Sequence, residues 1–258
     1  MNPIAQKQKY TVAVVSDVHG NAAALRAVLK DLESQKYDEL VFAGDYVLFG
    51  PRPAETLHLV QEQYAKVIYG NTDRFISHNT GPEKLQPSVE WTAYRIGDHG
   101  IKYLADLPFK YQLTPPGGKS PDNDLLVVHA TPTDVDAVLI LEPDPFNNNC
   151  VTEEEEAAAM LGNARADLIV YGHIHYASQG MIKGQRLQSI GSVGFPFDGK
   201  PQAAYAFADW DGSKWEVRHR RVAYDYTTAA EELAATAAPF AGFAAERLRM
   251  ARFIPMGI

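Results

Sequence analysis

The first half of the chain alternates short apolar runs with segments whose apolar residues have helical spacing. Tyr10–Ser16 is a run of apolar and β-branched residues, which is typical of a buried strand. The next apolar residues recur with the period of an amphipathic helix: Leu25, Val28, Leu29 and Leu32. Asn21 is placed to cap this helix, a second helical segment covers residues 54–63, and further apolar runs occupy 40–43 and 66–69. This β-α-β-α-β order predicts a parallel sheet.

A helical insertion is predicted for residues 74–107. Its expected buried face consists of Trp91, Tyr94, Ile101 and Leu104. Beyond it, residues 109–114 and 125–128 are predicted as paired strands around a turn rich in Pro, Gly and Asn. Residues 168–171 and 186–190 are further predicted strands. Thr152 and Glu155 have the spacing of a capping box and predict the start of an Ala-rich helix between these strand regions.

The last third of the chain predicts a hairpin followed by helices. Residues 203–209 and 214–222 flank Asp211-Gly212, which is a strong hairpin signal. The Ala-rich segment 227–252 is predicted to be helical, with a break near Pro239, and to pack on its own domain in preference to a neighbouring molecule. No shift in composition divides the chain, so we expect residues 1–258 to form a single α/β domain of two packed sheets with helices outside.

Composition narrows the class of protein. Hydrophobic residues make up 46% of the 258 residues and charged residues 22%, which is ordinary for a globular chain and excludes a disordered one. The 24 basic and 32 acidic side chains give a formal net charge of −8, so we expect no stable nucleic-acid complex. An anionic substrate would need a local positive charge, for which a bound metal is the obvious source.

Several features predict a cytoplasmic protein that does not associate with membranes. The start of the chain, Met1–Lys9, is polar and has no secretory h-region. No run of about 18 apolar residues is present, as a membrane-spanning helix would require. Cys150 is the single cysteine, so no disulfide can form within the chain, which fits a reducing compartment.

Metal-ligating residue types follow five of the predicted strands. These residues are Asp17 and His19, Asp45, Asn71, His129, and His173 with His175. In an open α/β sheet, ligands bind at the carboxyl ends of the strands, so we expect these side chains to meet at one edge. Each residue taken alone also has a structural interpretation, such as a helix cap, a turn or a buried histidine. Their coincidence at one edge favours a metal site.

The donor set indicates two ions. Seven protein ligands are too many for one first-row ion but suit two ions that share a bridging carboxylate. Mixed oxygen and imidazole donors favour Mn²⁺ first, with Fe or Zn²⁺ as alternatives, over Ca²⁺. Two such ions about 3.5–4 Å apart form the clamp used for phosphoryl transfer.

The motifs stand in the order of a known family. They are Asp17-Val18-His19, Gly44-Asp45, Gly70-Asn71-Thr72-Asp73, His129 and Gly172-His173-Ile174-His175. The sequence resembles the calcineurin-like metallophosphoesterase superfamily, whose pattern runs D-x-H, G-D, G-N-H-D/E, H and G-H-x-H. Residues 190–194, with Asp198-Gly199 beyond them, look like a marker of its bacterial small phosphodiesterase-like branch, so the resemblance covers about residues 10–210.

The resemblance implies a fold and a role for each ligand. The fold would be a four-layer α/β/β/α sandwich of two mixed sheets flanked by helices. Asp17, His19 and His175 would hold one metal ion, and Asn71, His129 and His173 the other. Asp45 would bridge the two ions, and a metal-bridging hydroxide would be the nucleophile. Asn71 would also lie near the phosphoryl oxygens of the substrate.

Two departures from the family pattern bear on the substrate. Thr72 stands where family phosphomonoesterases commonly carry a His that protonates the leaving oxygen, and a Thr hydroxyl is too weak an acid for that role. Leu48-Phe49 stand where the protein-phosphatase branch has Asp-Arg, so a phosphate-clamping Arg is missing too. Nearby residues that could contact the substrate instead are Arg52, Arg74 and Asn21.

We therefore expect a metal-dependent phosphoesterase that hydrolyses phosphodiesters with good leaving groups. The expected catalytic residues are Asp45, Asn71, His129 and Thr72. The substrate would be a small phosphoester, such as a nucleotide. Alternatives are a phosphomonoesterase, a protein Ser/Thr phosphatase and a dinucleoside polyphosphate hydrolase, or, from another class, a catalytically idle scaffold with the same fold. The oligomeric state stays open.

Overall fold

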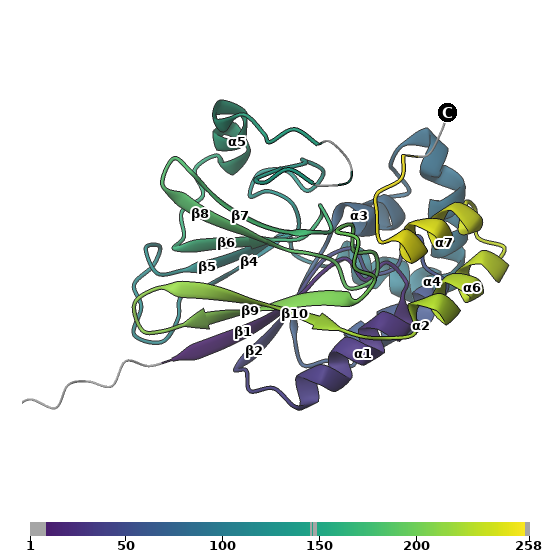
Figure 1. The fold of residues 1–258 in the computed structure, drawn as a ribbon, viewed down its shortest axis with the longest axis horizontal. Coiled ribbons are helices and arrows are strands. Elements are labelled where there is room, and N and C mark those ends of the chain that lie inside the picture. The colour runs from purple at the N-terminus through teal and green to yellow at the C-terminus, as the bar shows by residue number, and fades with distance from the viewer. Residues whose placement is uncertain (1–8, 145, 147–148, 256–258) are drawn as a thin grey trace, which may run out of the picture.

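Two five-stranded sheets pack face to face in the computed structural model, which describes residues 9–144, 146 and 149–255 (Figure 1). The first sheet has the order β10-β9-β1-β2-β3. Its strands are β1 (Tyr10–Val15), β2 (Glu39–Ala43), β3 (Lys66–Ile68), β9 (Ala203–Trp210) and β10 (Trp215–Val222). β1, β2 and β3 run parallel, whereas β9 is antiparallel to both β1 and β10. The predicted hairpin around Asp211-Gly212 is confirmed as the β9–β10 pair.

The second sheet is also mixed, with the order β4-β5-β6-β8-β7. Its strands are β4 (Lys110–Leu113), β5 (Leu125–Val128), β6 (Leu168–Tyr171), β7 (Ala177–Ile182) and β8 (Gln185–Ile190). β5, β6 and β8 run parallel, and the edge strands β4 and β7 are antiparallel to their neighbours. β7 has no counterpart among the strands that the sequence predicts, because its residues mix polar and apolar side chains without alternation.

Helices cover the outer faces of both sheets (Figure 1). The described residues form seven α-helices: α1 (Ala22–Glu33), α2 (Pro53–Gln61), α3 (Asn71–His78), α4 (Gln86–Ala105), α5 (Glu154–Leu161), α6 (Tyr226–Ala235) and α7 (Ala241–Met250). A 3-10 turn, Glu83–Leu85, precedes α4. Side chains of α1, α2 and α4 join one core cluster with the first sheet, and α5 joins another with the second sheet. The prediction of an α/β sandwich with two mixed sheets is confirmed.

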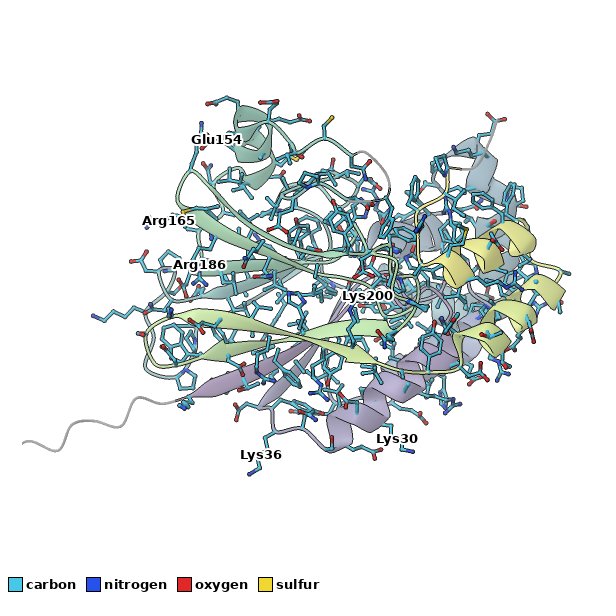
Figure 2. All side chains as sticks on the ribbon, in the orientation of Figure 1. Lys30, Lys36, Glu154, Arg165, Arg186 and Lys200 are labelled. Atoms are coloured by element: carbon cyan, nitrogen blue, oxygen red, sulfur yellow. The ribbon has the colours of Figure 1, made fainter. Side chains whose placement is uncertain are left out.

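Alternation along each strand divides the core into layers, because successive strand side chains point to opposite faces. In β1, Val12 and Val14 belong to the cluster between the two sheets, whereas Ala13 and Val15 face the helices. Trp210 and Trp215 close the end of the layer between the sheets, with ring centres 5.6 Å apart. Charged side chains such as Lys30, Lys36 and Glu154 project from the surface (Figure 2).

Two local predictions about helices are wrong. Tyr94 belongs to the expected buried face of the insertion but is 85% exposed. Gly97 has φ 65° and interrupts the helical geometry of α4, so the residues before it do not continue the face of Ile101 and Leu104. Thr152 does not cap α5. Its hydroxyl instead accepts a hydrogen bond from the backbone N–H of Ile140, and the helix begins at Glu154.

The two C-terminal helices pack against a loop of the sandwich. α6 and α7 pair with each other and bury small residues such as Ala230 and Ala245 against Phe195 and Phe197. Figure 1 shows both helices close to the loops at one end of the sheets, and α6 contacts α1. In the part of the chain described here, no helix is long and apolar enough to cross a membrane.

Candidate metal centre

The structure brings all seven predicted ligands to one edge of the sandwich. Loops after β1, β2, β5 and β6 carry six of them, and Asn71 is the first residue of α3, just past β3. We call this set the metal rim: Asp17, His19, Asp45, Asn71, His129, His173 and His175. Because parallel strands of both sheets end at this edge, residues far apart in sequence become neighbours.

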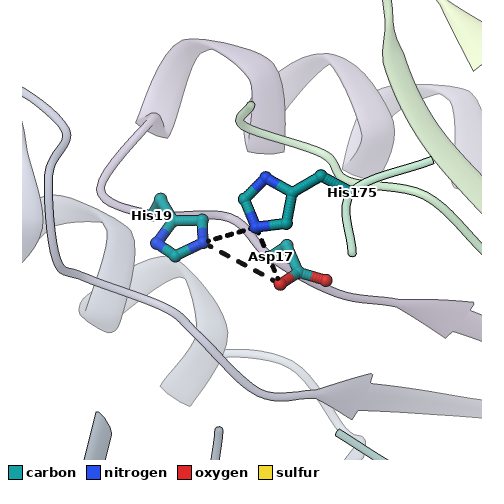
Figure 3. Close-up of side chains that lie close together, drawn as sticks. All are labelled: Asp17, His19 and His175. Atoms are coloured by element: carbon teal, nitrogen blue, oxygen red, sulfur yellow. Dashed lines mark hydrogen bonds and ion pairs between the residues drawn. The ribbon is translucent and has the colours of Figure 1, made fainter. Parts of the chain in front are cut away.

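The first group within the rim is Asp17, His19 and His175 (Figure 3). The Nε2 atom of His175 lies 3.2 Å from Asp17 Oδ1 and 3.1 Å from His19 Nε2, and His19 Nε2 lies 3.8 Å from Asp17 Oδ1. All three side chains are buried. Three donor atoms within these distances can contact one small cation.

The second group contains His129, Asn71 and His173. The Nε2 atom of His129 lies 3.1 Å from Asn71 Oδ1 and 3.3 Å from His173 Nδ1. Asp45 lies between the two groups, because its Oδ2 atom is 3.5 Å from His19 Nε2 and 3.5 Å from His129 Nε2. One carboxylate oxygen therefore contacts an imidazole from each group.

Backbone carbonyls orient three of the imidazoles. The Nδ1 atoms of His19, His129 and His175 donate to the carbonyls of Leu48, Ala43 and Phe195, at 3.1, 2.8 and 2.6 Å. A neutral ring that donates from Nδ1 presents the lone pair of Nε2 to a cation, and such outer hydrogen bonds are typical of metal-ligating histidines. With these tautomers the Nε2 lone pairs of His19 and His175 face each other at 3.1 Å, and a cation between them would remove that repulsion.

The rim residues have unusual backbone conformations. Five of the seven lie in the left-handed region: Asp17, His19, Asp45, His173 and His175, with φ between 51° and 65°. This conformation costs about 1–3 kcal/mol for a residue other than glycine, and such residues cluster at functional sites. Hydrogen bonds between the loops hold it in place, such as His19 N–H to Asp45 O at 2.9 Å and Gly194 N–H to Asp17 O at 2.9 Å.

Asp73, the last residue of the G-N-T-D motif, holds the backbone of the rim through hydrogen bonds. Its carboxylate accepts backbone hydrogen bonds from Gly70, Asp45 and Tyr46, at 2.9, 2.7 and 3.0 Å. Burial and the nearby Asp45 carboxylate raise the pKa of Asp73 to about 7, against the effect of these hydrogen bonds. Asp73 thus fixes the loop of Asp45 relative to the start of α3.

Two motif glycines leave room for the carboxylates. A Cβ atom on Gly70 would come within 2.1 Å of Asp45 Oδ1, and one on Gly172 within 2.3 Å of Asp17 Oδ2. Both approaches are shorter than any real contact, so a larger residue at either position would displace a predicted ligand.

The buried carboxylates and imidazoles of the rim shift one another's pKa values. Burial lowers the pKa of His19 and of His173 to about 4, so these imidazoles are neutral at pH 7. Burial also opposes protonation of His129, but the Asp45 and Asp17 carboxylates outweigh it and raise the pKa of His129 to about 10. The two buried carboxylates thus attract positive charge to the rim, which fits a cation-binding site.

The other predicted site residues have different surroundings. Asn21 is buried and caps α1, accepting from Ala24 N–H at 3.1 Å, while its amide donates to Gly194 O at 3.0 Å. Arg52 pairs with Glu232 at 2.5 Å and with Glu55 at 3.1 Å, and Arg74 pairs with Asp136. In this structure, Asn21, Arg52 and Arg74 therefore contact protein groups and do not line the cavity described next.

A cavity of about 390 Å³ opens beside the metal rim. Asp45, Asn71, Thr72 and His173 contribute its polar floor. The rest is largely aromatic, and we call these six residues the aromatic wall: Phe49, Phe195, Phe197, Phe240, Phe243 and Phe253. The apolar pattern of the sequence did not predict this wall. Phenylalanines spaced along 240–253 beside Arg247 are the signal that could have suggested it, although the same pattern also suits a packed helix.

Fold and site together define a metallophosphoesterase. A family model described as calcineurin-like phosphoesterase matches residues 10–177, which include the whole metal rim. The chain therefore belongs to the calcineurin-like phosphoesterase family, and the prediction of the family is confirmed. Its buried Asp and His groups are consistent with a metal site.

Individual relatives support the same fold. The uncharacterized protein MJ0912 of Methanocaldococcus jannaschii is 27% identical over 237 residues, which are 87% of this chain and 92% of that protein. A metallophosphoesterase crystal structure from Sphaerobacter thermophilus matches with a TM-score of 0.71 and 24% identity, covering 94% of this chain and 99% of that one. The hypothetical protein PH1004 of Pyrococcus horikoshii OT3 matches with a TM-score of 0.73 and 22% identity, covering 93% and 97%.

Proposed function

We propose that the protein hydrolyses phosphodiesters with the help of two divalent cations, Mn²⁺ first, with Fe or Zn²⁺ as alternatives. Asp17, His19 and His175 would hold one cation, and Asn71, His129 and His173 the other. The position of Asp45 carries the proposal, because Asp45 Oδ2 lies 3.5 Å from an imidazole of each group. When bound, two such cations supply Lewis acidity at the phosphoryl group and lower the pKa of water.

Charge favours a diester over a monoester. A phosphodiester carries one negative charge at pH 7, whereas a monoester carries nearly two, because its second pKa is near 6. Arg52 and Arg74 pair with carboxylates and do not line the cavity, so neither guanidinium is placed to bind a second phosphate charge. The cations would then supply most of the positive charge, which matches a monoanionic substrate better.

Thr72 would act as a hydrogen-bond donor. Its side chain lines the cavity and is buried, and its hydroxyl has no hydrogen-bond partner among the described residues. A buried hydroxyl without a partner is costly, and a substrate oxygen would satisfy it. Asn71, the neighbouring residue at the start of α3, would orient the phosphoryl oxygens through its amide. Neither residue is an acid at pH 7, so the leaving group would depart with little protonation.

Leaving groups provide the test of this proposal. We expect the purified protein with Mn²⁺ to hydrolyse aryl phosphodiesters about 10²–10⁴-fold faster than alkyl ones, which is the usual contribution of the missing general acid. Rates would be measured on a panel of diesters and monoesters of graded leaving-group pKa. Equal rates on aryl and alkyl diesters would refute the absence of an acid, and no turnover with any divalent metal would favour an idle scaffold.

Thr72→Val tests the hydroxyl. The variant should lower kcat/KM about tenfold, the value of one hydrogen bond, without loss of stability because the hydroxyl has no described partner in the folded protein. Thr92→Val, a buried threonine of α4 that does not line the cavity, is the matched control. A Thr72→Val rate equal to that of the wild type would exclude Thr72 from the reaction.

A further inference from the structure

The aromatic wall is continuous with the metal rim. The Phe197 ring stacks on the imidazole of His175, with centres 4.4 Å apart and an interplanar angle of 16°. Phe253 meets Phe197 edge to face at 5.6 Å. Phe49 and Phe195 lie with ring centres 5.8 Å from that of His19, which neighbours His175. A group attached to a phosphate at the rim would therefore enter the cavity lined by the aromatic wall.

Arg247 of α7 is built into this wall. Its guanidinium carbon lies 4.5 Å from the ring centre of Phe253 and 4.6 Å from that of Phe243. The Nε atom donates to Ile254 O at 2.8 Å, and Nη2 donates to the same carbonyl. Among the described residues, no carboxylate pairs with it and Nη1 has no hydrogen-bond partner. The half-buried guanidinium thus lines the cavity, and one of its nitrogens has no hydrogen-bond partner among the described residues.

The outer phenylalanines of the wall are partly exposed to solvent, and one of them has a strained backbone conformation. Phe240 is 44% exposed and Phe253 is 42% exposed, and neither they nor Phe243 belong to the described core clusters. Phe240 also has φ 61°, a left-handed conformation that is a genuine outlier for a bulky side chain. Exposed apolar patches and stored strain both mark binding sites.

We propose that this wall, with Arg247, binds a planar aromatic group of the nucleobase kind that is carried by the phosphoester substrate. The inference rests on the proposed phosphodiesterase function and names its substrate class. Flat rings stack on phenylalanine faces, and a guanidinium stacks on a ring or donates to its polar edge. A volume of about 390 Å³ falls in the range of small-molecule sites.

An alkyl chain would fit the cavity less well than a heteroaromatic ring. Arg247 and the Asn149 side chain both line the cavity, and a chain without polar atoms would cover them without replacing their hydrogen bonds with water. A heteroaromatic ring offers apolar faces to the phenylalanines and acceptors at its edge to these donors. The mixed lining therefore favours a heteroaromatic ring over a lipid-like chain.

Three diesters with the same leaving group isolate this effect. They are the p-nitrophenyl ester of thymidine 5′-monophosphate, methyl p-nitrophenyl phosphate and hexyl p-nitrophenyl phosphate, each assayed with full-length protein and Mn²⁺. We expect kcat/KM for the thymidine diester to exceed that for the methyl diester at least tenfold, mainly through KM. The hexyl diester should show a smaller gain.

Variants of the wall should reduce that ratio. Phe243→Leu keeps apolar bulk but removes the ring, and Arg247→Ala removes the cation; each should lower the thymidine-to-methyl ratio about fivefold or more. Arg249→Ala on the same helix and Tyr94→Ala on α4 are matched controls outside the cavity and should leave the ratio unchanged. Thermal unfolding of each variant checks that it is folded.

The outcomes separate the two proposals. Equal kcat/KM for the thymidine and methyl diesters, or an equal gain for the hexyl diester, would overturn the aromatic subsite and leave the phosphodiesterase proposal standing. If no diester is hydrolysed with any metal, the proposed function fails, and calorimetric titration of metal-free protein with thymidine 5′-monophosphate decides the subsite. Binding that Phe243→Leu weakens would support the subsite, and no binding to the wild type would overturn it.

Discussion

The metal rim and the aromatic wall are built in opposite ways. The rim consists of buried polar residues just past the strand ends, and it lies entirely within the segment 10–177 that the family model matches. All six wall residues are phenylalanines, and five of these follow residue 177, in the loop after β8 and around α7. Under the two proposals, one part of the chain would hold the reacting phosphate and another would select the group that the phosphate carries.

The two regions also differ in how rigidly they are held. Backbone carbonyls and the Asp73 carboxylate fix the rim from several sides. The wall is held by ring contacts and by one arginine that bridges two rings, and its outer phenylalanines are partly exposed. Phe197 joins the two regions, because it stacks on His175 and contacts Phe253.

Asp45→Asn should have the largest effect, and it should impair the metal rim without impairing the aromatic wall. It keeps the shape of the side chain but removes the charge that lies between the two ligand groups. Metal catalysis supplies several kcal/mol to the transition state, so the rate should fall by about 10³-fold or more. Metal content measured by elemental analysis should drop, while binding of thymidine 5′-monophosphate to metal-free protein should persist. Metal content equal to that of the wild type would contradict a bridging role for Asp45.

Asp73→Asn should have an intermediate effect on the rim alone. An amide accepts fewer hydrogen bonds than a carboxylate, so one or more of the N–H groups of Gly70, Asp45 and Tyr46 would lose its partner. Outer residues of metal sites typically contribute 10–100-fold to metal affinity, and we expect about that loss in a metal titration. Asp98→Asn on α4 is the control. An unchanged affinity would show that Asp73 does not position the rim.

Asp31→Asn, remote from both regions, should alter stability but not activity. Arg220 donates two hydrogen bonds to the Asp31 carboxylate, at 2.8 and 2.7 Å, and Tyr205 adds a third; together they outweigh partial burial and lower the pKa of Asp31. A carboxyl whose folded-state pKa is depressed stabilises the protein above its unfolded pKa of 3.8, and this contribution is lost as the pH falls through the lower folded value.

At pH 7 the variant should lose about 1 kcal/mol of unfolding free energy, a modest value because the pair is partly exposed to solvent. The difference from wild type should shrink as the pH falls below about 4. Urea unfolding at several pH values would measure both effects, with Glu33→Gln on α1 as the control. A difference that stays constant down to pH 3 would exclude the proposed linkage.

The elements of the sandwich were largely predictable from local patterns. Apolar runs marked β1, β2 and β5, and Asn21 marked the start of α1. Tyr94 and Thr152 show where local pattern fails. Gly97 changes the exposed face of α4 through its backbone, and Thr152 bonds to Ile140 instead of to its own helix. In both cases a local preference yields to a backbone conformation or a contact that the spacing does not reveal.

The sequence by itself determined which residue types follow the strands, because a strand and the turn after it are local features of the chain. That information was enough to predict a metal site and its seven candidate ligands. Only the tertiary structure decided which atoms face one another, with Asp45 between two groups of ligands and Arg52 and Arg74 directed to carboxylates. It also brought Phe49, Phe195 and Phe253 to one cavity, because side-chain direction and the packing of distant segments depend on the whole fold.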